Sequence, residues 1–116
     1  MDLAGLDDVL SVMDGDAILM AQQIGRRLGM GVGISSGANF LGAVLAQEAL
    51  APEAVVVTLF PDSNKKYLST DLLRDEPVRT GYLAPEVELL GFRATGRACR
   101  LCADPVTGAD PRSPRA

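Results

Sequence analysis

Histidine is absent from this sequence of 116 residues, and cysteine occurs only twice. Without histidine the chain cannot build a Ser-His-Asp or Cys-His nucleophile system, and it lacks the usual imidazole ligands of zinc enzymes. The first residues, Met1-Asp2-Leu3, do not resemble a secretory signal, which begins with a charged region and an apolar core. Two cysteines without such a signal predict a reducing, cytoplasmic setting.

Long apolar runs and clusters of basic residues are also missing. No stretch approaches the ~20 apolar residues of a membrane-spanning helix, so we expect no membrane partner. The net charge is −4 and no basic block is longer than Lys65-Lys66. Because phosphate contacts need clustered lysine and arginine, we expect no nucleic-acid partner. The length fits one small domain, and the sequence contains no internal repeat.

The most informative stretch places two serines between an apolar strand and an apolar helix. We predict a short strand over Val32–Ile34, then Ser35 and Ser36, then a helix that starts at Gly37 or Ala38. In α/β proteins this order puts the hydroxyls and the first free N–H groups of the helix into a ligand crevice, where the helix dipole favours electron-rich atoms. Either serine could instead be the N-cap of the helix. Local chemistry leaves both roles open.

Two helices are predicted around this stretch. Helical spacing of apolar residues indicates a first helix that begins at Asp14 or Asp16 and is closed by Gly29. The second helix runs to Leu50 and ends before Pro52, and it is apolar almost all round. Such a helix is typical of the interior of a larger protein or of a contact with a partner.

The remaining patterns predict strands and a weakly organised C-terminal region. Ala54–Phe60 is a continuous β-branched run that suits a parallel strand covered on both faces, and 8–13 could form a short edge strand. Alternating strands and helices give right-handed βαβ units and therefore an α/β fold with a parallel sheet. Ser63 or Asn64 begins a short helix. We divide the chain into a core domain (1–75), an irregular extension (76–102) and a disordered tail (103–116).

Cys99 and Cys102 form a lone C-x-x-C motif. A zinc site needs four ligands, and this chain offers two thiolates and no imidazole. A redox pair is expected at a helix N-terminus after a strand, which no pattern predicts here. We therefore interpret the two residues as ordinary reduced thiols and predict no metal site.

Three segments in order resemble the cysteine synthase family, which comprises pyridoxal-phosphate enzymes of fold type II, the tryptophan synthase β-like type. They are DGDAILMA (14–21), GVGISSGANFLGAVLAQ (31–47) and VVVTLFPDSNKKYLST (55–70). The resemblance covers residues 8–73 and would correspond to about the last third of a full-length member. It implies a partial three-layer parallel sheet, the C-terminal portion of the large domain.

The resemblance also implies a cofactor contact. In this family the first serine of the S-S-G segment, which matches Ser35, hydrogen-bonds the pyridine nitrogen of pyridoxal phosphate. A neutral hydroxyl leaves that nitrogen unprotonated and the ring a moderate electron sink, which suits β-replacement on O-acetylserine or a related serine ester. An aspartate would protonate the ring, and positions 35 and 36 carry none.

The chain departs from the family in what it lacks. Lys65 and Lys66 are the only lysines and lie in the third matching segment (55–70), not in a Schiff-base context. No glycine/threonine-rich phosphate loop and no substrate-carboxylate loop is present. We therefore expect a C-terminal piece of such an enzyme, with Met1 an internal methionine of the parent, no catalytic residue of its own and no activity alone.

Two further expectations follow from that interpretation. The parent would be a homodimer that acts on a small amino-acid substrate. Whether that substrate is O-acetylserine, O-phosphoserine, or serine with homocysteine depends on loops outside this chain. The alternative is a stand-alone, non-catalytic α/β module that uses its apolar helix for binding or dimerisation.

Overall fold

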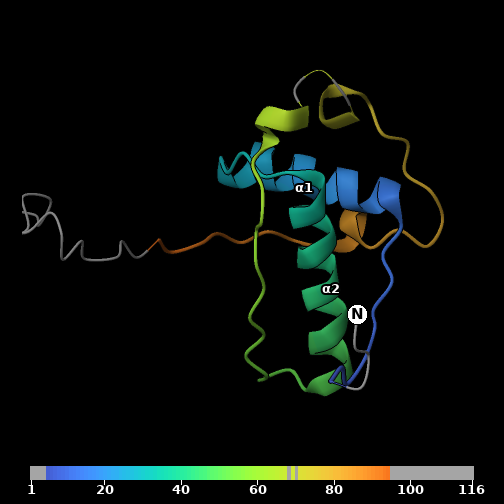
Figure 1. Ribbon diagram of the computed structural model, residues 1–116, viewed down its shortest axis with the longest axis vertical. Helices are drawn as coiled ribbons and strands as arrows, with labels where there is room; N and C mark the ends of the chain where they lie inside the picture. Colours follow the sequence, from blue (N-terminus) through green and yellow to red (C-terminus); the bar gives the residue numbers. More distant parts are fainter. Residues whose placement is uncertain (1–4, 68, 70, 95–116) are drawn as a thin grey trace, which may run out of the picture.

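In the computed structural model two long helices cross, and extended segments connect them to the rest of the chain (Figure 1). The structure describes residues 5–67, 69 and 71–94. Helix α1 spans Asp14–Leu28 and helix α2 spans Ile34–Leu50. Three short 3₁₀ helices follow: η1 (Asn64–Tyr67), η2 (Asp71–Leu73) and η3 (Ala84–Glu86).

Helix α1 begins and ends where the sequence predicts. Asp14 and Asp16 lie in its first turn, where negative charge is favoured by the helix dipole. Gly29 terminates the helix in the left-handed conformation (φ 70°), and its N–H donates to the carbonyl of Gly25 (3.1 Å). The predicted bounds of this helix are confirmed.

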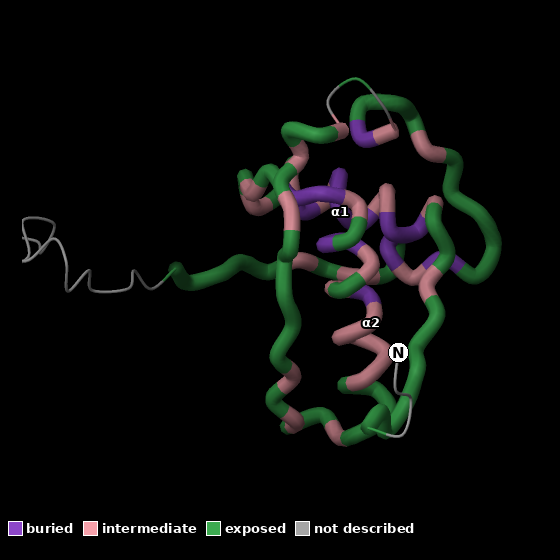
Figure 2. Tube along the Cα trace, viewed as in Figure 1, coloured by how far each residue is buried: buried purple, intermediate pink, exposed green. Residues whose placement is uncertain are grey.

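The core lies where α2 crosses α1. Met20 and Ile24 of α1 and Leu41 of α2 are fully buried there. Gly37 lies at the crossing, where a Cβ would collide with the carbonyl oxygen of Ala17 and approach the amide nitrogen of Ala21 to 2.9 Å. Figure 2 shows the buried residues gathered on α1 and the α1-facing end of α2, while the far half of α2 is only partly covered.

Helix α2 starts earlier than predicted. Gly33 precedes the first turn as the N-cap, with extended backbone angles, so the helix begins at Ile34 and not at Gly37 or Ala38. The serines therefore lie inside the first turn, and of the two alternatives for them the one in which Ser35 or Ser36 is the N-cap is wrong. The predicted strand over Val32–Ile34 is also wrong, because Val32 makes only one isolated antiparallel bridge, to Ser63.

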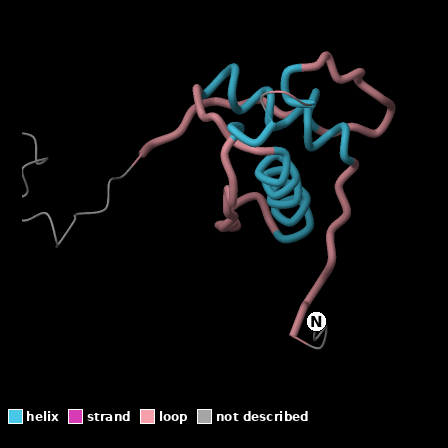
Figure 3. The backbone as a smooth tube through the Cα atoms, turned by 45° about the horizontal axis from the view of Figure 1, so that its top comes forward, coloured by secondary structure: helices cyan, strands magenta, loops and turns pink. Residues whose placement is uncertain are grey.

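The predicted parallel sheet is not formed within the described residues. The segments 8–13 and 54–60 are extended but do not form strands. A strand exists through hydrogen bonds to a neighbouring strand, and these segments flank α2 on opposite sides instead of pairing (Figures 1 and 3). In segment 54–60, the side chain of Val55 is 91% exposed and that of Val57 is 86% exposed.

Within residues 77–94 the one helical element is η3, and this region is anchored to α1. The buried carboxylate of Asp16 accepts the backbone N–H groups of Leu83 and Ala84, both at 2.8 Å. The Gln23 side chain donates to the Ala84 carbonyl (2.9 Å). The domain boundaries stay predictions. Cys99, Cys102 and the predicted tail (103–116) lie outside the described residues.

No helix in the part of the chain that the structure describes is long and apolar enough to cross a membrane.

The helix crossing yields a paired prediction on two glycines of α2. Gly37→Ala should lower the free energy of unfolding by about 1–3 kcal/mol, because the added methyl meets the α1 backbone. Gly42→Ala should raise it by about 1 kcal/mol, because no atom lies within 4 Å of its Cβ position and alanine favours helix. Urea denaturation followed by circular dichroism measures both. Equal effects of the two substitutions would contradict the close crossing.

Candidate functional site

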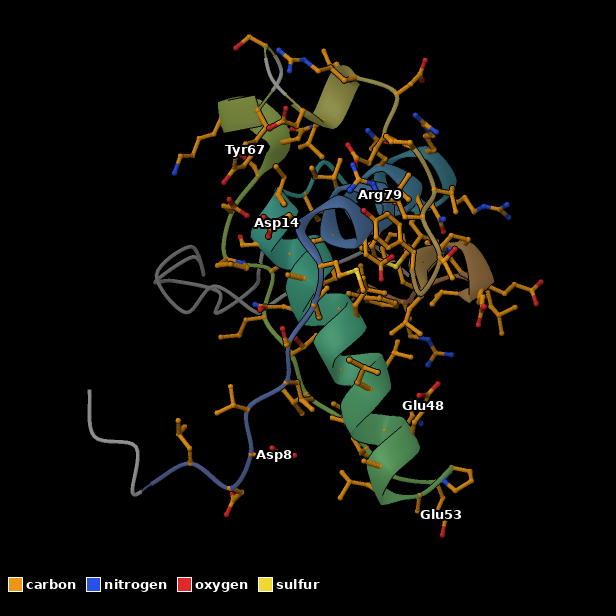
Figure 4. The ribbon with its side chains drawn as sticks, turned by 90° about the vertical axis from the view of Figure 1, so that its right-hand side faces the viewer. Asp8, Asp14, Glu48, Glu53, Tyr67 and Arg79 are labelled. Atoms are coloured by element: carbon orange, nitrogen blue, oxygen red, sulfur yellow. The ribbon has the colours of Figure 1, made fainter. Side chains whose placement is uncertain are left out.

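The start of α2 is joined to the turn at Asp62 by two backbone hydrogen bonds. Gly33 N–H donates to the carbonyl of Asp62 (3.1 Å), and Asn64 N–H donates to the carbonyl of Gly31 (2.9 Å). The turn around Asp62 follows directly on the extended segment 54–60. The two backbone hydrogen bonds therefore bring the Asp62 side chain to the first turn of α2. Figure 4 shows Tyr67, from the same region, near this end of α2, with Glu48 and Glu53 near the other end.

Asp62 accepts hydrogen bonds from three hydroxyl groups. Ser35 Oγ donates to Oδ1 (2.8 Å), Ser36 Oγ lies 3.3 Å from the same oxygen, and Tyr67 OH donates to Oδ2 (2.9 Å). Ser36 Oγ also lies 3.4 Å from the carbonyl oxygen of Asp62. Since an ionised carboxylate only accepts, all three hydroxyls must act as donors.

These contacts shift two ionisation equilibria in opposite directions. The hydrogen bond from Ser35, followed by that from Tyr67, holds the pKa of the Asp62 carboxyl below its usual value of 3.8. Desolvation opposes this shift and raises the pKa, while Ser36 and the charge of Lys66 lower it by smaller amounts. The hydrogen bond to Asp62 raises the pKa of Tyr67 above its usual value of 10.0. At neutral pH the carboxyl is therefore ionised and the phenol keeps its proton.

Gly33 makes room for this cluster. A Cβ at position 33 would collide with the carboxylate of Asp62. The backbone angles of Gly33 (φ −86°, ψ 176°) are accessible to any residue, so the requirement concerns space and not conformation. A side chain here would push Asp62 away from Ser35.

The two serines have different surroundings. Ser36 is fully buried, whereas Ser35 is exposed at the first turn of α2. The Ser35 oxygen can therefore reach a ligand while its proton points to Asp62. Ser36 thus supplies a buried structural hydroxyl. Ser35 supplies an accessible hydroxyl, and it is the residue predicted to contact the cofactor.

Sequence reasoning missed the role of Asp62. The short helix predicted to begin at Ser63 or Asn64 is confirmed as η1, but the sequence pattern gives neither Asp62 nor Tyr67 a part in the site. The feature of the sequence that could have indicated this role is the presence of Asp62 and Tyr67 together in the third family-like segment (55–70). The contact of Asp62 with Ser35 is not visible in the local sequence, because the two residues are 27 positions apart.

The described residues fit one part of pyridoxal phosphate. An exposed hydroxyl oxygen at a helix N-terminus can hydrogen-bond a ring nitrogen, and Ser35 supplies one. Lys65 and Lys66 both lie exposed on η1, so neither is a buried amine of the kind that forms a stable Schiff base. Among the described residues no group of three acidic or thiol side chains could hold a metal ion.

Comparison with solved structures first identifies the class of enzyme that the chain resembles. No family profile matches the chain. Its matches to solved structures are fold type II pyridoxal-phosphate enzymes, an α/β class. A hydrogen sulfide-producing enzyme from Fusobacterium nucleatum is 56% identical, with a TM-score of 0.70 over 73% of this chain and 25% of its own. A mutant of the hydrogen sulfide-producing enzyme, in complex with an α-aminoacrylate intermediate, has a TM-score of 0.71.

Two curated relatives are cysteine synthases. The cysteine synthase of Buchnera aphidicola is 34% identical over 76 residues, which are 65% of this chain and 24% of that protein. Cysteine synthase B of Campylobacter jejuni is 41% identical over 68 residues, 58% of this chain and 22% of that protein. The chain thus spans about a quarter of the length of the relatives it matches. The predicted resemblance to the C-terminal part of a cysteine synthase is confirmed.

The ionised state of Asp62 gives a pH prediction. Because its folded-state pKa is lowered, its stabilising contribution is complete above pH 3.8 and is lost as the pH falls through the lower pKa of the folded chain. The free energy of unfolding of the wild type should therefore decline more steeply below pH 3.8 than that of Asp62→Asn. Denaturant titrations across this range measure the difference. Parallel pH profiles would contradict the hydrogen-bonded carboxylate.

Proposed function

We propose that the chain is the C-terminal segment of a pyridoxal-phosphate-dependent, cysteine synthase-like enzyme, in which Ser35 contacts the ring nitrogen of the cofactor. The reaction of the parent is β-replacement on O-acetylserine or a related serine ester. The observation that carries this proposal is the accessible Ser35 hydroxyl at the start of α2, held by Asp62 in a chain similar to cysteine synthases.

The chain's own residues would bind and orient. Pyridoxal phosphate supplies the electron sink for β-replacement when it is bound. Ser35 offers a neutral hydroxyl, and the N-terminus of α2 favours the electron-rich side of a ring placed there. Asp62 fixes the position of the Ser35 oxygen, and Tyr67 fixes Asp62 from the other carboxylate oxygen.

The rest of the site would come from outside this chain. Both lysines are exposed on η1, and the sequence contains no phosphate-binding loop. The Schiff-base lysine and the phosphate contacts therefore belong to other parts of the parent. It follows that this chain alone neither holds the cofactor covalently nor turns over substrate.

The surface of α2 also supports a missing remainder. An open groove of about 420 Å³ runs over α2 between its two extended neighbours. Its lining is mostly apolar and includes Leu10, Ala43 and Val56. Apolar grooves of this kind normally lie against other protein. We propose that strands of the parent's parallel sheet pack there, and that the parent is a cytoplasmic homodimer.

A second candidate rests on the same apolar surface. If another copy of the chain covered the groove, the protein would be a stand-alone, non-catalytic binding or dimerisation module. Sedimentation and a thermal melt of the purified chain, with and without pyridoxal phosphate, separate the two. The fragment proposal predicts that the chain forms no discrete dimer and that its melt does not respond to the cofactor. A discrete dimer with a cooperative melt would favour the module.

The cofactor contact can be tested in a chimera. This chain would replace the matching quarter of the Fusobacterium hydrogen sulfide-producing enzyme, whose remainder supplies the other contacts. Ser35→Ala should weaken binding of pyridoxal phosphate about tenfold, the loss of one hydrogen bond worth about 1.4 kcal/mol. Ser63→Ala, on an exposed neighbour of Asp62, is the matched control and should leave affinity unchanged. Fluorescence or absorbance titration of the apo-chimera measures affinity, and equal affinities for both variants would refute the role of Ser35.

A further inference from the structure

Ser35 carries one hydroxyl proton, and the structure already assigns it. That proton is donated to Oδ1 of Asp62 over a distance of 2.8 Å. An unprotonated ring nitrogen offers only a lone pair and requires a donor. The carboxylate and a bound ring would therefore compete for the same proton.

The surroundings of Asp62 allow the proton to be released. Ser36 Oγ stands 3.3 Å from the same Oδ1, so this oxygen keeps a donor when Ser35 turns away. Tyr67 continues to donate to Oδ2 (2.9 Å), and the positive charge of Lys66 acts on the same carboxylate. A carboxylate left without donors would resist the exchange strongly. Asp62 avoids this free-energy cost because Ser36 and Tyr67 still donate to it.

We propose that Asp62 is a positioning residue that holds the Ser35 oxygen in place and yields the Ser35 proton to an aromatic ring nitrogen on binding. Ser36 then remains as the donor to Oδ1. The exchange replaces one hydrogen-bond acceptor by another, so no covalent bond forms or breaks and no proton changes its heavy atom. The second half of this inference rests on the proposed function, because the ring is that of the cofactor.

The exchange couples the cofactor site to Tyr67. When Ser35 turns away, the carboxylate loses its strongest donor and becomes a stronger acceptor for the phenol of Tyr67. Binding should therefore raise the pKa of Tyr67 further, and it should also raise the pKa of Asp62. A ring that contacted Ser35 without taking its proton would leave both values where they are.

The first experiment uses the full chain without cofactor. Carboxyl groups of ¹³C-labelled aspartate are titrated by NMR, and the Asp62 signal is assigned by its loss in Asp62→Asn. Ser35→Ala should raise the pKa of Asp62 more than Ser36→Ala does, because Ser35 makes the shorter bond. Ser63→Ala should leave it unchanged. An unshifted Asp62 in Ser35→Ala would overturn the positioning role.

The second experiment adds pyridoxal phosphate to the chimera. The phenol of Tyr67, labelled at Cζ with ¹³C and assigned by Tyr67→Phe, is titrated with and without saturating cofactor. The pKa of Tyr67 should rise on binding with serine at position 35 and stay constant in Ser35→Ala. A loaded chimera whose Tyr67 does not respond would overturn the exchange. A chimera that takes up no cofactor would instead overturn the proposed function, and the exchange with it, while the first experiment still decides the positioning role.

Discussion

The close contact between α1 and α2 at Gly37 determines where the first turn of α2, and with it the candidate site, lies. Because residue 37 has no side chain, the first turn of α2 lies directly on the backbone of Ala17 and Ala21. Leu41, one turn further on, completes the buried core with α1. The first turn also carries Ser35, so the packing that stabilises the helix pair places the accessible hydroxyl and directs it to Asp62. The core and the candidate site thus depend on the same end of α2.

The rest of α2 shows the opposite situation. Beyond Leu41 no residue of the helix is fully buried, and the extended segments beside it expose valine side chains to solvent. Burial of such side chains is a main source of folding free energy. These side chains are exposed, and the chain spans only about a quarter of the length of its relatives, which supports the proposal that it is one layer of a larger domain. The α/β class therefore comes from the relatives, while this chain contributes the helices.

Local signals predicted the helices well and the site only in part. The acidic first turn and Gly29 define α1, and Pro52 predicts the end of α2 at Leu50, because these are short-range effects of charge and backbone geometry. The start of α2 was misjudged, since Gly33 and not a serine became the N-cap. Strands over 32–34 and 54–60 were predicted from β-branched residues, yet strands need neighbours that the described residues do not provide. Ser35 was found through resemblance, whereas its partner Asp62 is a tertiary contact that no local pattern encodes.

The central claim is that Ser35 supplies the ring-nitrogen contact of a pyridoxal-phosphate enzyme. A crystal structure of the cofactor-loaded chimera tests it most directly. The account predicts the Ser35 oxygen within about 3 Å of the pyridine nitrogen, with Ser36 and Tyr67 still on the carboxylate of Asp62. A cofactor whose ring nitrogen contacts another residue or water, with Ser35 still bonded to Asp62, would contradict it.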